Sequence, residues 1–402
     1  MSDAFLLRAG SGMDADSSRQ LPGHPNALFG RGTAARLGVV LDEFDTQRCL
    51  VVRGGASYAN CGASSYVEDA LRGRHVAFVY AEHHQVTVRA VASALALKGD
   101  FGPDTVVGVG GGSVLDLAKA VSALTPQDPL AIAAVLQGRL PVRQRNRLVL
   151  IPTTAGSGSE ITPFATLWNG FDKLSLDAPE LLADAVLVDP NLALTVPHHV
   201  SVAAVADALC QAAESYWAVA GTPQSREWAA AAYQQLVAAI GPGCASGGFH
   251  HESLRERIAW CASLAGAAIA VSRTTAAHAL SYPLTGRLGI PHGAAALLSL
   301  PWLAEHNYAS TSEDCVIEGG VHHLRMLIDD LRSWCANLAG TSLAGIANRL
   351  LAFGGYPTVY RELAQGQWES DLLTMVGSPR MKNNPRRITV SDIRALLQQS
   401  RR

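Results

Sequence analysis

Short runs of apolar residues alternate with helical patterns through the first half of the chain. Four short, continuous runs predict buried strands: RCLVVRG (48–54), HVAFVYA (75–81), DTVVGVGGG (104–112) and RLVLIPTT (147–154). The segments SYVEDALRG, TVRAVASALAL and SVLDLAKAVSALT, which lie among them, have the apolar spacing of helices. Strands that alternate with helices in this way predict a doubly wound, parallel α/β sheet.

The pattern changes after about Pro190, where long helical stretches replace the strands. SVAAVADALCQAAESYWAVA and ESLRERIAWCASLAGAAIAVS are rich in Ala and Leu and carry few strand signals. A chain of 402 residues also exceeds one ordinary hydrophobic core. We therefore predict a flexible N-terminal arm over residues 1–24, an α/β domain over 25–190 and an all-α domain over 191–402.

Composition narrows the class of protein. The chain is 48% hydrophobic and 16% charged, which is typical of a globular α/β enzyme. Its net charge of −2 gives no field that would attract nucleic acid or an anionic membrane, and no apolar run approaches the roughly 20 residues of a membrane span. The N-terminus has no secretion signal, and the seven cysteines are scattered without a CxxC pair, so we expect reduced thiols in a cytoplasmic protein.

The stretch GVGGGSVLDLAK (108–119) follows one predicted strand and opens a helix. Three consecutive glycines, 110 to 112, allow the backbone to approach an anion, and the helix amides then point at it. Ser113 adds a hydroxyl, and Asp116 and Lys119 lie one turn apart in the helix. We expect a dinucleotide pyrophosphate site, although the stretch is neither GxGxxG nor a P-loop; the alternative is a tight turn that binds nothing.

The stretch IPTTAGSGSEITPFATLW (151–168) follows the next predicted strand. Its small and hydroxyl residues offer many hydrogen-bond donors to a polar ligand. Two such loops after neighbouring strands predict a ligand crevice at the carboxyl edge of the sheet. Taken alone, the stretch is also compatible with a Ser/Gly-rich surface loop.

The predicted helical domain carries polar residues that suit a metal site. Asp207, Gln211 and Glu214 follow at i, i+4 and i+7 on one helix face. His278 lies in a later predicted helix, and His292 stands between Pro291 and Gly293, where another helix begins. One aspartate and two histidines from different helices would suit a divalent transition metal. Each of them alone is more often a hydrogen-bonded core residue or a helix cap.

Five ordered motifs, GGGSxxDxAK, PTTAGSGSE, DALxxAxES, HAL and GIPHG, resemble those of the iron-containing (group III) alcohol dehydrogenases. The resemblance extends from FGRG at residue 30 to NNPRR at 383–387. It implies the architecture shared with dehydroquinate synthase, in which a Rossmann-like domain binds NAD(P) and an all-α domain holds the metal. Catalysis in that family takes place in the cleft between the two domains.

The resemblance also assigns residues. It places around NAD(P)H the residues Gly54, Gly110, Gly111, Gly112, Ser113, Asp116, Thr153, Thr154, Ser157, Thr162 and Lys173. It places at the metal, expected to be Fe²⁺ with Zn²⁺ or Mn²⁺ as alternatives, the residues Asp207, Gln211, His278 and His292.

Two positions of the metal side depart from the family pattern. Gln211 stands where most relatives have a fourth histidine, and an amide oxygen is a weaker ligand for Fe²⁺ or Zn²⁺ than imidazole. Three interpretations follow: a weaker metal site with Gln211 as an oxygen ligand, which we favour, catalysis without metal, or a disabled site. Tyr282 replaces a histidine of the family's proton relay, and its hydroxyl either donates the proton or only fills space.

A third departure concerns the cofactor. Gly54 stands at about the place where many NAD-selective relatives carry an acidic residue for the ribose 2′-hydroxyl, and Arg53 precedes it. Removal of the carboxylate removes its repulsion of a 2′-phosphate, and an arginine favours that phosphate. NADPH use is therefore expected, unless Arg53 simply points into solvent.

The segment RTTAAHALSYPLTGRLGIPHG, together with PFATLW and KNNPRR, resembles the phosphonoacetaldehyde reductase branch of the family. Arg273 and Arg287 each precede a metal histidine by five residues, which suits an anionic substrate; the alternative is that they pair with acidic residues elsewhere. We expect reduction of a small aldehyde such as phosphonoacetaldehyde to 2-hydroxyethylphosphonate, with Tyr282, Lys173 and Arg273 as the catalytic groups.

Other functions stay open at this point. They are a general aldehyde reductase without anion preference, a cyclase like dehydroquinate synthase, and a catalytically silent relative that binds the cofactor. We expect a small-molecule substrate as the partner, without nucleic acid or membrane. A homodimer is common among such relatives, but the sequence shows no interface of its own.

Overall fold

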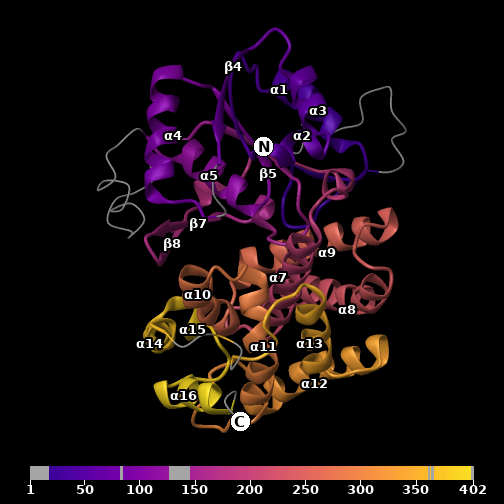
Figure 1. The fold of residues 1–402 in the computed structure, drawn as a ribbon, viewed down its shortest axis with the longest axis vertical. Coiled ribbons are helices and arrows are strands. Elements are labelled where there is room, and N and C mark those ends of the chain that lie inside the picture. The colour runs from indigo at the N-terminus through magenta and orange to yellow at the C-terminus, as the bar shows by residue number, and fades with distance from the viewer. Residues whose placement is uncertain (1–17, 82–84, 126–144, 361–362, 364–365, 400–402) are drawn as a thin grey trace. The chain divides into compact units, whose positions relative to one another are not determined.

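The computed structural model describes residues 18–81, 85–125, 145–360, 363 and 366–399. The chain divides into two compact units, Met1–Val196 and Pro197–Arg402, each of which can be followed in Figure 1. The first unit contains a sheet with helices, and the second is helical, as the sequence pattern predicts. The change of pattern near residue 190 precedes the division by a few residues.

Among the described residues, the sheet of the first unit has seven strands in the order β1-β2-β9-β6-β5-β3-β4, and every neighbouring pair except β1 and β2 is parallel. Its strands are β1 (Arg19–Gln20), β2 (Ala27–Phe29), β3 (Arg48–Arg53), β4 (His75–Tyr80), β5 (Thr105–Gly110), β6 (Arg147–Pro152) and β9 (Ala185–Val188). The four predicted strands are β3 to β6. Val, Leu and Ile fill these strands, and the central strands β5 and β6 are buried almost throughout because helices cover both faces.

Helices pack on the two faces of this sheet (Figure 1). On one face, α1 and α3 share a hydrophobic core with alternate residues of β3, β5 and β6; on the other, α5 packs against β5 and β6 and also contacts α4. The α-helices in the described part of this unit are α1 (Leu37–Glu43), α2 (Ala56–Asn60), α3 (Ala63–Ala70), α4 (Val88–Phe101) and α5 (Gly112–Ala123). The predicted doubly wound parallel sheet is therefore confirmed.

Two features of the first unit differ from the expectation. Residues 1–17 of the predicted flexible arm lie outside the described residues, but the arm does not extend to residue 24, because Arg19–Gln20 pairs with β2 and the buried His24 bonds the Ala183 carbonyl at 2.9 Å. An antiparallel hairpin of β7 (Phe164–Asn169) and β8 (Asp172–Asp177) was not predicted at all. Its first strand includes most of the PFATLW segment.

The second unit is built around α7 (His198–Trp217), most of whose residues are buried. This helix packs against α8, α9 and α11, so even its polar residues lie inside the unit. The other helices are α8 (Pro223–Ala245), α9 (Glu252–Ser272), α10 (Ala276–Leu288), α11 (His292–Tyr308), α12 (Gly320–Ala339), α13 (Leu343–Phe353), α14 (Trp368–Thr374), α15 (Pro379–Lys382) and α16 (Val390–Gln399). Among the described helices, none is long and apolar enough to cross a bilayer. All seven cysteines lie in the described residues, and none of them forms a disulfide.

Candidate functional site

The two glycine- and hydroxyl-rich loops of the first unit lie against each other at the carboxyl ends of β5 and β6. A Cβ at Gly111 would lie 3.2 Å from Thr154 Cγ2, and one at Gly112 would lie 2.8 Å from Ser157 Oγ. Because β5 and β6 are parallel neighbours, both loops leave the same edge of the sheet. The two loops therefore lie next to each other, as their positions after neighbouring strands predict, and a side chain at Gly111 or Gly112 would have to displace Thr154 or Ser157.

A buried lysine holds the second loop in place. The ammonium of Lys119 donates to Ser159 Oγ at 3.0 Å, to Thr162 Oγ1 at 3.1 Å and to the Phe164 carbonyl at 2.8 Å. Burial lowers the pKa of Lys119 to about 8, so the side chain still carries its proton near neutral pH. Lys119 thus links α5 to the loop and to the start of β7.

Asp116 takes part in the same network. Its carboxylate accepts from Ser159 Oγ at 2.6 Å and from the Thr166 amide at 2.9 Å. Burial raises the pKa of Asp116, while Lys119 and also Lys173 on β8 oppose that rise. Asp116 and Thr162, which the family resemblance assigns to the cofactor, therefore hold the loop through protein contacts, and Lys173 lies near them on the unpredicted hairpin.

Arg53 is fixed beside Gly54 at the end of β3. Its guanidinium lies over the rings of Tyr58 and Tyr80 at 4.5 and 4.4 Å and over Phe78 at 5.4 Å. It also donates to Tyr80 Oη at 2.9 Å and to the Gly54 carbonyl at 3.3 Å. Arg53 thus has a defined position, stabilised by cation–π contacts, and does not simply extend into solvent.

The second unit brings together three of the four predicted metal ligands. Potential ligand atoms of Asp207 on α7, His278 on α10 and His292 at the first residue of α11 all lie within 4.8 Å of one another. His278 Nε2 is 3.2 Å from Asp207 Oδ1. The approach of α11 to α7 depends on Gly293, since a Cβ there would lie 2.2 Å from the Ala203 carbonyl oxygen.

Glu214, noted in the sequence only as a neighbour on the same helix face, orients the first histidine. One of its oxygens accepts from Thr275 Oγ1 at 2.7 Å and from the Ala277 amide at 2.6 Å, and the other contacts His278 Nδ1. With Nδ1 bonded to this carboxylate, His278 Nε2 faces Asp207. Carboxylates commonly fix metal-binding histidines in this way. Glu214 and His278 are 64 positions apart, so spacing alone gave no sign of the contact.

The electrostatics of the cluster suit a cation. Burial alone would lower the pKa of His278, but Glu214 and Asp207 raise it to about 9. Burial would likewise raise the pKa of Glu214, yet His278 and its hydrogen bonds hold it below the ordinary value. Two buried carboxylates around a histidine favour positive charge, whether as a proton or as a metal ion that displaces it. The donor set fits a divalent transition metal.

The remaining predicted residues of the second unit differ in their contacts. Gln211 is buried on α7, one turn after Asp207. Tyr282 stacks on His292 with ring centroids 5.8 Å apart and 24° between planes. Arg273 ends α9, and its guanidinium donates to the Ala270 carbonyl at 2.6 Å. Arg287 instead forms an ion pair with Asp371 of α14 at 2.7 Å, so the expectation of a second guanidinium for the substrate is wrong and its stated alternative holds.

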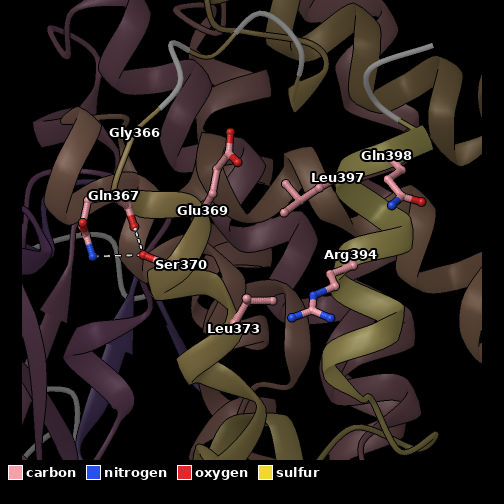
Figure 2. Close-up of a pocket in the computed structure, with 8 residues that line it drawn as sticks. All are labelled: Gly366, Gln367, Glu369, Ser370, Leu373, Arg394, Leu397 and Gln398. Atoms are coloured by element: carbon pink, nitrogen blue, oxygen red, sulfur yellow. Dashed lines mark hydrogen bonds between the residues drawn. The ribbon is translucent and has the colours of Figure 1, made fainter.

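A cavity of about 460 Å³ lies elsewhere in the second unit, between α14 and α16 (Figure 2). Ser370 and Leu373 line it from α14, and Arg394 and Leu397 line it from α16. None of the residues that line it belongs to the predicted metal or cofactor sets. This hollow is therefore not the candidate active site.

The position of Glu214 gives a testable result. Changing Glu214→Gln should lower the affinity of the chain for Co²⁺ or Fe²⁺ by about 10- to 100-fold, because the amide polarises and orients His278 less well than a carboxylate. An anaerobic metal titration of the folded variant measures this. Glu305→Gln, the same change at an exposed residue of α11, is the control. Equal affinity of the Glu214 variant and the unchanged protein would contradict the assigned role.

Family models match both halves of the chain. Residues 25–190 match the model described as iron-containing alcohol dehydrogenase, and residues 201–338 match the model of the C-terminal part of the Fe-containing alcohol dehydrogenase family. The chain is 32% identical over 310 residues to the phosphonoacetaldehyde reductase of Streptomyces viridochromogenes, covering 73% of this chain and 75% of that protein.

Solved structures of related proteins show the same fold. An iron-containing alcohol dehydrogenase of Thermotoga maritima aligns with a TM-score of 0.80 and 25% identity over 95% of this chain and 99% of that one. A sulfoacetaldehyde reductase of Bifidobacterium kashiwanohense, solved in complex with NAD⁺, aligns with a TM-score of 0.80 and 23% identity over 97% and 99% of the two chains.

Proposed function

The chain belongs to the iron-containing alcohol dehydrogenase family, and we propose that it uses NADPH to reduce a small anionic aldehyde, of the kind of phosphonoacetaldehyde, to its alcohol. That it is an oxidoreductase acting on CH–OH groups follows from the family. The observation that carries the proposal is the cluster of buried Asp207, buried His278 and half-buried His292, in which Glu214 orients His278. We propose a cytoplasmic location as well, in keeping with the free cysteines.

Asp207, His278 and His292 would hold the divalent ion, with the Gln211 carbonyl oxygen as a fourth, weaker ligand. When bound, such an ion acts as a Lewis acid that polarises a carbonyl oxygen, and NADPH supplies the hydride. The chain's own contribution is orientation: Glu214 fixes one ring, and Ser281 Oγ lies 2.8 Å from His292 Nδ1, which fixes the other. Fixed donors cost little reorganisation at the moment of reaction.

Tyr282 is the proposed source of the proton. It lies one helical turn after His278 on α10, and its ring stacks on His292. A tyrosine hydroxyl in this place either donates directly to the developing alkoxide or orders a water that does so. Lys173 remains a proposed neighbour of the nicotinamide, since it lies close enough to Asp116 to influence that carboxylate.

Two observations support an anionic substrate. The relative with 32% identity is a phosphonoacetaldehyde reductase, and Arg273 stands at the end of α9, directly before the helix that carries His278. A guanidinium offers a planar pair of donors that matches a phosphonate or carboxylate. Arg273 is therefore the proposed anchor for the charged end of the aldehyde.

The cofactor preference rests on Gly54 and Arg53. Changing Gly54→Asp should lower the ratio of kcat/KM for NADPH over NADH by about 10- to 100-fold, because a carboxylate repels the 2′-phosphate and accepts a bond from a ribose 2′-hydroxyl. The new Cβ would lie 2.7 Å from Ser57 Oγ, a short side chain that can rotate away. Steady-state kinetics with both cofactors measure the ratio.

Gly55→Asp is the matched control for this change, since it adds the same charge one residue farther on, where a Cβ meets nothing within 4 Å. It should leave the ratio within about threefold of the unchanged protein. A strong preference for NADH in the unchanged protein would refute the proposed role of Arg53.

The function itself is tested by the loss of NADPH absorbance under anaerobic conditions with ferrous iron, comparing phosphonoacetaldehyde with propanal. We expect fast turnover of the phosphonate and slow turnover of propanal. Equal or faster reduction of propanal would replace the proposal by a general aldehyde reductase. Cofactor binding without turnover of either aldehyde would favour the silent relative, for which the replacement at Gln211 is the specific observation.

A further inference from the structure

The turn between α9 and α10, residues 272–275, contains a strained arginine. Arg273 has φ 63° and ψ 173°, a backbone conformation that is essentially restricted to glycine. Among the described residues, Asp45 alone of the other non-glycine residues has a positive φ, and its value of 51° is that of an ordinary left-handed turn. Such strain persists only where neighbouring contacts determine the conformation.

Asn383 supplies those contacts. Its side-chain amide donates to the Ser272 carbonyl at 2.8 Å and to the Thr274 carbonyl at 3.1 Å, so one NH₂ group holds both sides of Arg273. Its side-chain oxygen accepts from the Ala220 amide at 3.0 Å. The amide nitrogen and the amide oxygen of its side chain thus connect this turn to the segment that follows α7. Asn383 belongs to the KNNPRR segment, which is part of the resemblance to the phosphonoacetaldehyde reductase branch.

The same turn is connected to the metal cluster by hydrogen bonds to Glu214, the residue that orients His278. Thr275 Oγ1 donates to Glu214 and accepts from Trp217 Nε1 at 3.1 Å, and the Ala277 amide donates to Glu214 as well. A shift of residues 272–275 therefore shifts the start of α10, which carries His278. A glycine at position 273 would satisfy the backbone without strain, and the guanidinium of the arginine found there donates to the Ala270 carbonyl in the last turn of α9.

We propose that Asn383 is a positioning residue, which locks the 272–275 turn so that Arg273 is presented to the charged end of the substrate and the start of α10 stays on Glu214. This inference rests on the proposed function for its substrate, an anionic aldehyde. The fixing of residues 272–275 by the side chain of Asn383, which we call the clamp, depends only on the hydrogen bonds of Asn383. The two parts can therefore be tested separately.

Asn384→Ala is the matched control for Asn383→Ala. Asn384 is the next residue and also an amide, more deeply buried than Asn383, but it donates to Asn307 Oδ1 on α11 and to the Arg386 carbonyl. Asn383→Asp adds an isosteric variant that keeps the acceptor for Ala220 and loses both donors. Arg273→Gly removes the guanidinium together with the strain, and its folding does not depend on the clamp.

For the substrate, we expect Asn383→Ala, Asn383→Asp and Arg273→Gly to raise KM for phosphonoacetaldehyde by about 10-fold or more, with KM for propanal changed by less than about threefold. Asn384→Ala should change both values alike. Wild-type enzyme that treats the two aldehydes equally would refute the proposed anionic substrate. If the unchanged enzyme prefers the phosphonate and both Asn383 variants keep that preference, the role of Asn383 is refuted, while the proposed anionic substrate stands.

For the clamp, hydrogen exchange of the peptide that covers residues 274–278 needs neither substrate nor metal. Asn383→Ala and Asn383→Asp should speed exchange of the Ala277 and His278 amides by about 10-fold, whereas Asn384→Ala should not. Arg273→Gly should leave this exchange unchanged and should not lower Tm. Exchange rates that do not distinguish Asn383→Ala from Asn384→Ala would overturn the clamp, whatever the substrate.

Discussion

Replacing His278 by alanine should lower kcat/KM for the aldehyde by about 10³-fold or more. The histidine offers Nε2 at the centre of the proposed metal site and binds Glu214 through Nδ1, so its loss removes a ligand and leaves a buried carboxylate without its partner. Loss of metal assistance to a carbonyl reaction costs several kcal/mol of transition-state stabilisation. Steady-state kinetics and the metal content of the purified variant measure both effects.

The same variant should also be less stable, by about 3 to 5 kcal/mol, because an uncompensated buried charge is costly. His306→Ala is the control, since His306 is a buried histidine of α11 outside the cluster. It should lose stability and keep its activity and metal. A His278→Ala enzyme that retains a tenth of the activity would show that the cluster does not act in the reaction.

Gln211→His should raise the affinity for Fe²⁺ or Zn²⁺ by about 10- to 100-fold. The change places an imidazole one turn after Asp207, at a buried position on the same face of α7 as Asp207 and Glu214. Imidazole binds these ions better than an amide oxygen does, whereas Mg²⁺ and Mn²⁺ prefer oxygen. The affinity for Mn²⁺ should therefore rise less than that for Zn²⁺. Competition titrations of both proteins with each ion measure the difference.

Gln224→His controls for the addition of any histidine, because it places the same group at an exposed position of α8. It should leave the affinity for each ion unchanged. If Gln211→His binds Zn²⁺ no more tightly than the unchanged protein, Gln211 does not occupy the fourth ligand position. The interpretation of a weak but complete metal site would then fail.

The parallel sheet was predictable because its strands carry continuous apolar runs, whereas the hairpin of β7 and β8 was not. In β7 the burial alternates only in part, and its strand partner β8 begins at Asp172, three residues after β7 ends at Asn169. From the sequence alone, the segment PFATLW is interpreted as part of the loop that precedes it. The apolar pattern alone does not distinguish a strand from a loop there, and the signal that the sequence analysis missed is the two-residue loop Gly170–Phe171, whose glycine suits a tight hairpin turn.

The proposed metal ligands could be predicted from the sequence, but the residues that position them could not. Asp207, His278 and His292 stand in recognisable motifs, and the structure brings them together. Glu214 and Asn383 act on residues 64 and 111 positions away, and no spacing rule links residues that far apart. Asp116 stands in a motif that the family resemblance assigns to the cofactor, but in the structure its carboxylate accepts hydrogen bonds from Ser159 and Thr166.

The most direct test of the metal cluster is an anaerobic titration of the purified chain with Co²⁺, followed by its visible d–d absorption. We predict saturation at one ion per chain in the unchanged protein and no such band in His278→Ala. A titration without saturable binding, or an identical band in the variant, would contradict a metal centre at Asp207, His278 and His292.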